Sequence, residues 1–179
     1  MRILSSVLLG SVILSGCAGT ANQASQAPTP IAVTQLKPTE GNQANGAVSF
    51  MQKGDKILVD ARIDGLTPGL HGFHVHEKGD CSAPDAMSAG GHFNPSTKSH
   101  GDPAHADHHA GDLGNLNANA AGNAVLQLAV AASDFSLSRG APNSIVGKAL
   151  IVHADPDDYK TQPTGNAGKR VACGVISLQ

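Results

Sequence analysis

The chain has 179 residues, of which 40% are hydrophobic, and a formal net charge of −2 at pH 7. This length and composition fit one globular domain with a substantial core. The near-neutral charge excludes a strongly basic phosphate-binding surface, and a chain with no tryptophan and one tyrosine has no aromatic platform for stacked bases. We therefore expect no nucleic-acid partner.

The N-terminus predicts an export signal. Arg2 precedes an almost wholly apolar run over residues 3–14, which is too short to span a bilayer. The run leads into the sequence LSGC, which resembles the lipobox at which bacterial lipoprotein signals are cut before an acylated cysteine. We expect residues 1–16 to be a lipoprotein-type signal peptide and Cys17 to carry lipid. The alternative is a soluble periplasmic product with an unmodified Cys17.

The segment after the signal predicts a flexible tether over residues 17–30. It is small, polar and punctuated by proline, so it offers too little apolar surface to offset the entropy of ordering. The folded domain is expected over residues 31–179.

The three cysteines support this division. If Cys17 is acylated, Cys81 and Cys173 remain as one pair in an oxidising compartment, where a disulfide is expected. A reactive thiol pair is the competing interpretation, and it is disfavoured because the chain has no C-x-x-C arrangement.

The folded domain is predicted to be all-β. Short stretches alternate between apolar and polar residues and are bounded by Gly, Asn, Asp or Pro, which is typical of strands separated by turns. We expect strands at residues 31–37, 46–53, 56–63, 71–77, 124–130, 147–153 and 171–177. Short strands at this spacing indicate an antiparallel sandwich or a flattened Greek-key barrel.

Two long segments interrupt this rhythm, at residues 78–113 and 154–169. Loops of this length in a compact domain are usually functional or disordered. Because the first segment is rich in histidine, we expect functional loops.

The sequence GFHVHE raises a specific question about His74 and His76. Successive side chains of a strand point to opposite faces, so these two imidazoles share one face while Phe73 and Val75 share the other. The chain has nine histidines, and imidazole is a ligand that both zinc and copper accept. A transition-metal site is the first hypothesis. The alternatives are half-exposed polar positions on an ordinary strand and a histidine-rich surface that binds metal weakly.

The order of the motifs narrows the choice. GFHVHEKGDC, GGHFNP, KSH, HHAGDLGN, IVGKALIVH and GNAGKRVACG follow one another along the chain, and together they resemble the copper/zinc superoxide dismutase family from about Ile31 to Leu178. The export signal and the EKGDCSAPDAMSAGG segment resemble the bacterial exported branch. The resemblance implies an eight-stranded antiparallel Greek-key β-barrel with two long functional loops.

The resemblance also implies one copper and one zinc ion per subunit, with a histidine shared between them. The implied copper ligands are His74, His76, His92 and His153, and the implied zinc ligands are His92, His100, His109 and Asp112. His92 would also take part in catalysis, by accepting a proton that is passed on when peroxide forms.

Two further residues match the pattern of the family. The resemblance implies that Asp157 accepts hydrogen bonds from His74 and His100, although a solvated acid is an alternative and Asp155 or Asp158 are substitutes. It implies that Arg170 docks the substrate anion, whereas a charge at a strand edge is the alternative interpretation. Lys160 and Lys169 are left as candidates for long-range steering.

Three histidines remain outside this pattern. His71 falls where the family has a structural histidine that bonds to backbone. His105 and His108 have no trusted counterpart, so they are candidates for a further ion or for competition with His109 as zinc ligand.

The function implied is the dismutation of superoxide to oxygen and hydrogen peroxide, by alternating reduction and reoxidation of a histidine-bound copper next to a structural zinc. The alternatives are a non-catalytic periplasmic copper-binding module and a structural envelope protein. The expected location is the bacterial cell envelope, in the periplasm, with membrane contact through the lipid anchor only. A homodimer is an assembly that the resemblance implies.

Overall fold

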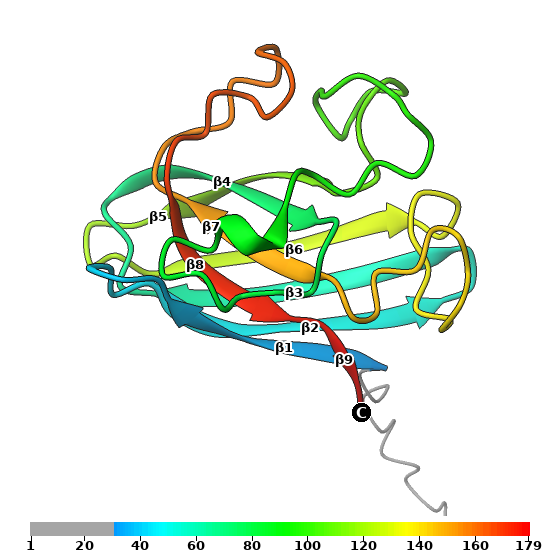
Figure 1. Cartoon of the computed structure of the whole chain (residues 1–179), viewed down its shortest axis with the longest axis horizontal. Helices are drawn as coiled ribbons and strands as arrows, with labels where there is room; N and C mark the ends of the chain where they lie inside the picture. The colour runs from blue at the N-terminus through cyan, green and yellow to red at the C-terminus, as the bar shows by residue number, and fades with distance from the viewer. Residues whose placement is uncertain (1–30) are drawn as a thin grey trace, which may run out of the picture.

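A computed structural model describes residues 31–179 (Figure 1). The expected signal peptide, the tether and Cys17 lie outside these described residues. Within them the elements are β1 (Ala32–Pro38), β2 (Asn45–Lys53), β3 (Lys56–Asp64), β4 (Gly69–His76), the 3-10 turn η1 (Met87–Ala89), β5 (Asp112–Ala118), β6 (Ala124–Ala131), β7 (Ala149–His153), β8 (Arg170–Val175) and β9 (Ser177–Leu178). No helix of the described part is long and apolar enough to cross a membrane.

The strands form one antiparallel sheet in the order β5-β4-β7-β8-β1-β2-β3-β6, with β9 paired to β1. Strands that are distant in sequence, such as β3 with β6 and β4 with β7, are hydrogen-bonded neighbours. The two end strands β5 and β6 approach each other, so the sheet nearly closes into a barrel. The predicted eight-stranded all-β fold is confirmed.

Apolar–polar alternation predicts every strand of this barrel except β5 and the short β9. The sequence of β5, DLGNLNA, contains Gly114, Asn115 and Asn117, residue types that are depleted in strands. Tertiary contacts override this weak propensity, because β5 pairs with β4 and Leu116 is fully buried.

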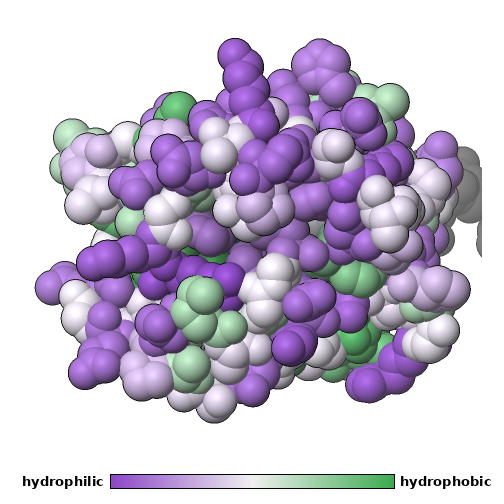
Figure 2. All heavy atoms as spheres, turned by 45° about the horizontal axis from the view of Figure 1, so that its top comes forward, coloured by the Kyte–Doolittle hydropathy of each residue, from purple (hydrophilic) through white to green (hydrophobic). Residues whose placement is uncertain are grey.

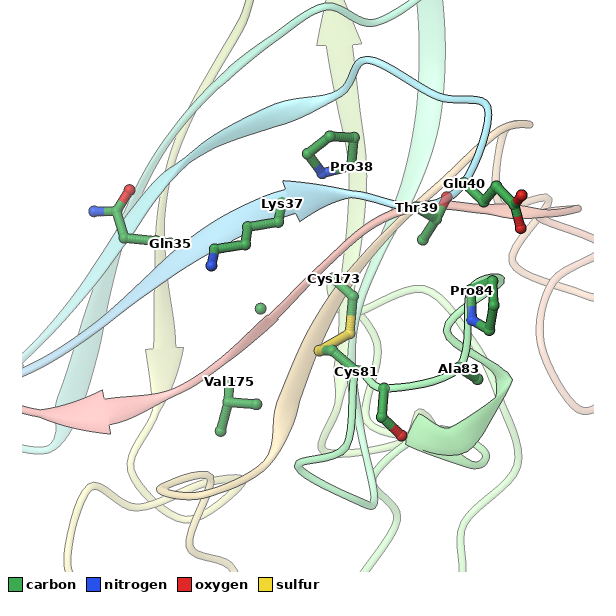
Figure 3. Close-up of a pocket in the computed structure, with 12 residues that line it drawn as sticks. Gln35, Lys37, Pro38, Thr39, Glu40, Cys81, Ala83, Pro84, Cys173 and Val175 are labelled. Carbon is green, nitrogen blue, oxygen red and sulfur yellow. A yellow bond between two sulfur atoms is a disulfide. The ribbon is translucent and has the colours of Figure 1, made fainter.

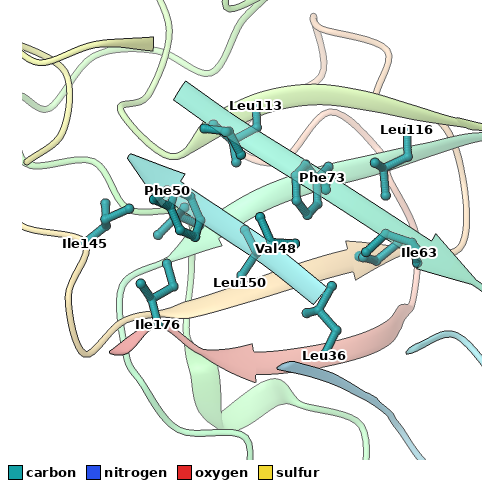
Figure 4. Close-up of a cluster of buried hydrophobic side chains, with 14 of the residues drawn as sticks. Leu36, Val48, Phe50, Ile63, Phe73, Leu113, Leu116, Ile145, Leu150 and Ile176 are labelled. Carbon is teal, nitrogen blue, oxygen red and sulfur yellow. The ribbon is translucent and has the colours of Figure 1, made fainter. Parts of the chain in front are cut away.

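The barrel is filled by aliphatic and phenylalanine side chains from all of its large strands (Figure 4). Phe50, Phe73, Ile63, Leu116 and Leu150 are at most 1% exposed. Burial of each such side chain contributes roughly 1.5–3 kcal/mol, so the packed interior gives a rigid scaffold for what its outer face and loops carry.

The two irregular segments leave the barrel on the same side, where Figure 1 shows them next to each other. The first connects β4 to β5 and the second connects β7 to β8. The face that bears them is mostly hydrophilic, with apolar residues scattered over it (Figure 2). This side of the molecule therefore brings together the histidine-rich loop and the end of β7.

A disulfide between Cys81 and Cys173 joins the first loop to β8, as the cysteine count predicted. The Cα atoms of the pair are 5.8 Å apart, which is ordinary for a disulfide. Figure 3 shows the bridge beside a surface hollow of about 420 Å³ that is also lined by Lys37 and Val175. The bridge fixes the start of a long loop on the barrel wall.

Breaking this bridge is expected to destabilise the protein strongly. The cysteines are 92 positions apart, and closing a loop of that length stabilises the folded state by up to about 4–5 kcal/mol in the chain-entropy model. The double variant Cys81→Ser/Cys173→Ser should show this loss in the free energy of unfolding measured with urea. Adding a thiol reductant should then leave the variant unchanged. A variant as stable as the oxidised wild type would contradict the expectation.

Candidate metal centre

Seven buried side chains form two groups whose ligand atoms lie within 4.8 Å of one another. We define the four-histidine group as His74, His76, His92 and His153, and the histidine–aspartate group as His92, His100, His109 and Asp112. His92 belongs to both groups. The structure thus brings together all of the ligands that the sequence analysis expected, in the two sets expected.

Strand β4 supplies half of the four-histidine group. His74 and His76 project from one face of β4 while Phe73 and Val75 project from the other, and all four side chains are fully buried. The alternative of half-exposed polar positions is therefore wrong. His153 closes the group from the end of β7, the strand that pairs with β4.

Hydrogen bonds select which nitrogen of each β4 histidine is free. His74 Nε2 lies 2.7 Å from Asp157 Oδ2, so its Nδ1, which is buried and has no hydrogen-bond partner, is the free atom. His76 Nδ1 lies 2.9 Å from the carbonyl oxygen of Gly90, which leaves its Nε2 free. A ring N–H that donates in this way fixes the tautomer and turns the other nitrogen's lone pair inward.

His153 follows the same rule. Its Nδ1 lies 3.2 Å from the carbonyl oxygen of Gly168, and its Nε2 lies 3.4 Å from Nε2 of His76. Each Nε2 carries a lone pair when its Nδ1 donates, so the two atoms cannot hydrogen-bond to each other. A shared cation would satisfy both. The four-histidine group therefore offers nitrogen donors only, which fits copper.

The histidine–aspartate group is centred on the carboxylate of Asp112. Nδ1 of His92 lies 2.8 Å from Asp112 Oδ1, and Nδ1 of His100 lies 3.0 Å from Oδ2. Nδ1 of His109 lies 3.5 Å from Oδ1. Nδ1 of His100 and Nδ1 of His109 are buried without a well-aligned hydrogen bond, although the carboxylate is near. Three nitrogens and one oxygen converge here, and two of the nitrogens have no hydrogen-bond partner, so the set fits a four-coordinate zinc ion.

Burial keeps the four-histidine group neutral. Desolvation lowers the pKa of His74, although the hydrogen bond to Asp157 partly offsets it. Desolvation, followed by repulsion from neighbouring histidines and Arg170, holds the pKa values of His76 and His153 well below the ordinary range. The pKa of His92 falls to about 4, again mainly through burial. Neutral imidazole is the form that binds a metal ion.

The histidine–aspartate group has the opposite balance. Burial disfavours the charged form of His100, yet the adjacent carboxylates of Asp112 and Asp157 outweigh it and raise the pKa of His100 to about 9. Burial likewise disfavours ionisation of both aspartates, but their histidine partners hold the pKa of each carboxyl well below its usual range. The carboxylate of Asp112 is therefore ionised, and the group presents its negative charge to a cation once that cation has displaced the proton of His100.

Asp157 connects the two groups. Its Oδ2 lies 2.7 Å from His74 Nε2 and its Oδ1 lies 2.9 Å from His100 Nε2. Asn115 on β5 holds the backbone of Asp157, because its side-chain amide donates to the carbonyl of Asp157 and accepts from its N–H. Gly165 packs against this contact with a φ of +65°, and a Cβ there would collide with both Asp157 and His100. Only glycine fits this close approach.

The two aspartates considered as substitutes for Asp157 do not approach the histidine rings. Asp158 is exposed and accepts hydrogen bonds from the N–H groups of Lys160 and Thr161. Asp155 is exposed beside Gly168.

Arg170, at the start of β8, is half-buried and anchored by two backbone carbonyls. It donates to the carbonyl oxygen of Ala86 at 2.7 Å and to that of Gly90 at 2.6 Å. The second carbonyl also accepts from His76, so the guanidinium sits next to the four-histidine group. Arg170 and His153 line one cavity of about 820 Å³, together with Lys169. Lys160 is not among the residues lining it.

The remaining histidines lie outside both groups. His71 is buried, and its Nδ1 and Nε2 lie 2.8 Å from the carbonyl oxygens of His153 and Thr67 respectively. Nδ1 of His108 lies 2.6 Å from the carbonyl oxygen of His109. His105 is exposed, with its Nδ1 3.5 Å from Asp102 Oδ2. His109, rather than His108, reaches Asp112.

Two amide side chains that the sequence analysis missed also contact the centre. Asn115 holds Asp157, and Gln162 hydrogen-bonds to the backbone of His100. Neither follows a ligand spacing rule, because an amide that bonds to backbone leaves no periodic signature. A strand assignment for β5 would have placed Asn115 correctly.

Comparison with known proteins agrees with this geometry. The family model for copper/zinc superoxide dismutase matches residues 44–176. The "Extracellular superoxide dismutase [Cu-Zn]" of Brugia pahangi is 44% identical over 159 residues, which cover 84% of this chain and 77% of that protein. The "Superoxide dismutase [Cu-Zn] 2" of Brassica juncea is 46% identical over 154 residues, which cover 82% of this chain and 97% of that protein. The chain belongs to the copper/zinc superoxide dismutase family, and it is an enzyme that uses copper and zinc to convert superoxide into oxygen and hydrogen peroxide.

Proposed function

We propose that the four-histidine group is the copper site of this dismutase, that the histidine–aspartate group is its zinc site, and that His92 bridges the two ions. The observation that carries this proposal is the orientation of His92. Its Nδ1 lies against Asp112, while its Nε2 is buried without a hydrogen-bond partner. The two ring nitrogens therefore serve different groups, as a bridging imidazolate requires.

The chain contributes proton transfer through His92. Copper, when bound, supplies the electron exchange by which one superoxide is oxidised to oxygen and a second is reduced. The second superoxide needs two protons to become hydrogen peroxide. We assign one to Nε2 of His92, because no protein group competes for this atom, and the other to solvent.

Arg170 is proposed to dock superoxide beside the copper site. Two of its N–H groups are taken by the carbonyls of Ala86 and Gly90, and a guanidinium has five donors, so others remain for an anion in the cavity. A copper-buffering protein would need no cation there. The shared cavity of Arg170 and His153 therefore favours catalysis over the buffering alternative.

Local charge, rather than net charge, is proposed to attract the substrate. The chain has a formal net charge of −2, which by itself repels an anion. Lys169 and Arg170 line the cavity, although Glu40 and Asp85 line it as well. Attraction through such a mouth is screened by salt within about 8–10 Å, so raising the ionic strength should slow the enzyme.

The zinc site is proposed to order the loop between β4 and β5. Zinc has no redox chemistry, and its ligands His100 and His109 come from that loop while Asp112 begins β5. Asp157 passes this order to the copper site through its contact with His74.

Export and lipid anchoring are proposed for the chain as a whole. The signal peptide over residues 1–16, the tether over 17–30 and acylation at Cys17 would hold the domain of residues 31–179 on a bacterial envelope membrane, facing the periplasm. Support comes from the Cys81–Cys173 disulfide, since disulfides persist in oxidising compartments, and from the relative named as extracellular. We further propose a homodimer, for which light scattering of the purified protein is the test.

Replacing Arg170 tests the catalytic proposal. Arg170→Gln removes the docking cation, so kcat/KM for superoxide should fall by roughly 10- to 100-fold while both metals stay bound. Stopped-flow superoxide decay and metal analysis would measure this. Arg62→Gln is the matched control, because Arg62 is an exposed cation on β3 and its loss changes the net charge equally. An unchanged rate in Arg170→Gln would contradict the docking role of Arg170.

Zinc affinity is expected to depend on pH. The pKa of His100 is raised to about 9 in the metal-free protein, so below that pH zinc must displace a proton. Apparent zinc affinity should rise about tenfold per pH unit toward pH 9 and level off above it. Competition with a chromogenic chelator between pH 6.5 and 9.5 would measure this. Copper affinity should change less, because burial already keeps His76 and His153 neutral. Equal slopes for the two metals would contradict the assignment.

Replacing Cys17 tests the anchor. In a bacterial host, the wild type should incorporate labelled palmitate and sediment with membranes, whereas Cys17→Ser should do neither. Cys81→Ser is the control, because its thiol belongs to the disulfide and its loss should leave the label in place. A soluble, unlabelled wild type would mean a periplasmic product without lipid.

A further inference from the structure

The side-chain amide of Gln162 pairs with the backbone of His100. Its Oε1 accepts a hydrogen bond from the His100 N–H at 2.9 Å, and its Nε2 donates to the His100 carbonyl at 2.8 Å. These are the two bonds that a neighbouring strand would make with one residue of a ladder. One side chain on the second loop thus holds the main chain of one residue on the first.

His100 depends on such a partner because it lies outside every strand of the described chain. The residue is 3% exposed, so its N–H and C=O are costly to leave unpaired. Its ring is fixed separately, by the 2.9 Å contact of Nε2 with Asp157. Asp157 sets the rotation of the ring, and Gln162 sets the position of the backbone from which the ring projects.

The second loop presents Gln162 in a prearranged turn. Asp158 accepts hydrogen bonds from both the N–H and the hydroxyl of Thr161, and Gly165 donates to the carbonyl of Thr161 at 2.7 Å. Gln162 is itself exposed, so its amide lies over the buried His100 from the solvent side. Hydrogen bonds within the second loop therefore hold the turn that carries Gln162, independently of its contact with the first loop.

We propose that Gln162 is a positioning residue for the zinc site, which aligns Nδ1 of His100 with the other zinc ligands by holding the His100 main chain. This inference rests on the proposed zinc assignment. The inference predicts different effects on zinc and copper affinity, because Gln162 does not contact His74, His76 or His153. Loss of the amide should weaken zinc binding and leave copper binding almost unchanged.

The test compares metal affinities of the full chain in four forms. Gln162→Ala removes the amide, and Gln162→Asn keeps it on an arm that is one methylene group shorter. Gln52→Ala is the matched control, because Gln52 is an exposed glutamine whose amide bonds only to the carbonyl of Gly54 in a distant turn. The fourth form is the wild type. Zinc and copper affinities are measured by competition with chromogenic chelators, and the unfolding of each metal-free form is measured with urea.

We expect Gln162→Ala to lose about 10- to 100-fold in zinc affinity, the range found when groups that support a metal ligand are removed. Gln162→Asn should lose zinc affinity in the same direction, and copper affinity should change by less than about threefold in both variants. Gln52→Ala should match the wild type. Since Gln162→Asn keeps the polar amide and removes only one methylene group, it keeps the test decisive if Gln162→Ala does not fold.

Two results would overturn the inference. Zinc affinity of the Gln162 variants within about threefold of wild type, even with lower stability against urea, would leave Gln162 with a structural role only. Equal losses for zinc and copper would place its effect on the whole centre. Failure of the zinc assignment is distinguishable, because His109→Ala would then bind zinc as tightly as the wild type, and the inference would fall with it.

Discussion

The centre depends on one buried carboxylate that accepts hydrogen bonds from two imidazoles. Asp157 contacts His74 of one metal group and His100 of the other, and both contacts use Nε2. The Nδ1 atoms of both rings are thereby turned toward the other side chains of their own groups. Since the two histidines come from β4 and from the long loop that follows it, the same carboxylate ties the rigid barrel to its least regular segment. Asn115 on β5 hydrogen-bonds to both the N–H and the carbonyl of Asp157, so β5 fixes the position of this carboxylate.

Burial and charge divide the two groups chemically. The four-histidine group has no carboxylate among its ligands, and burial keeps its rings neutral, so it offers nitrogen donors to a redox metal without trapping protons. The histidine–aspartate group contains Asp112 and adjoins Asp157, so it offers the charge that offsets a dication. His92 belongs to both environments. The two groups thus differ in local electrostatics although only a few side chains separate them. The difference follows the secondary structure, because the four-histidine group stands mostly on strands and the histidine–aspartate group mostly on a loop.

Much of the fold and part of the centre could be predicted from the sequence. Alternation located the long strands, and on β4 it also placed His74 and His76 on one face, because a strand has a fixed side-chain period. It failed at β5, where Asn and Gly have weak strand propensity and pairing with β4 decides the outcome. No periodicity brings His100 and His109 to Asp112, since a loop has no repeat, and only the family resemblance grouped them. Neither alternation nor the family resemblance identified Gln162, because its partner is the backbone of His100.

The disulfide also affects how the side chain of Arg170 is held. Arg170 lies three residues before Cys173 in the sequence, and β8 carries both. The carbonyls of Ala86 and Gly90, which accept from Arg170, lie in the loop that Cys81 attaches to β8. A single covalent link therefore clamps both the guanidinium and the backbone that aims it. Thiol reductants in a purification buffer would release the loop that holds Arg170, so the redox history of a preparation would affect its measured turnover.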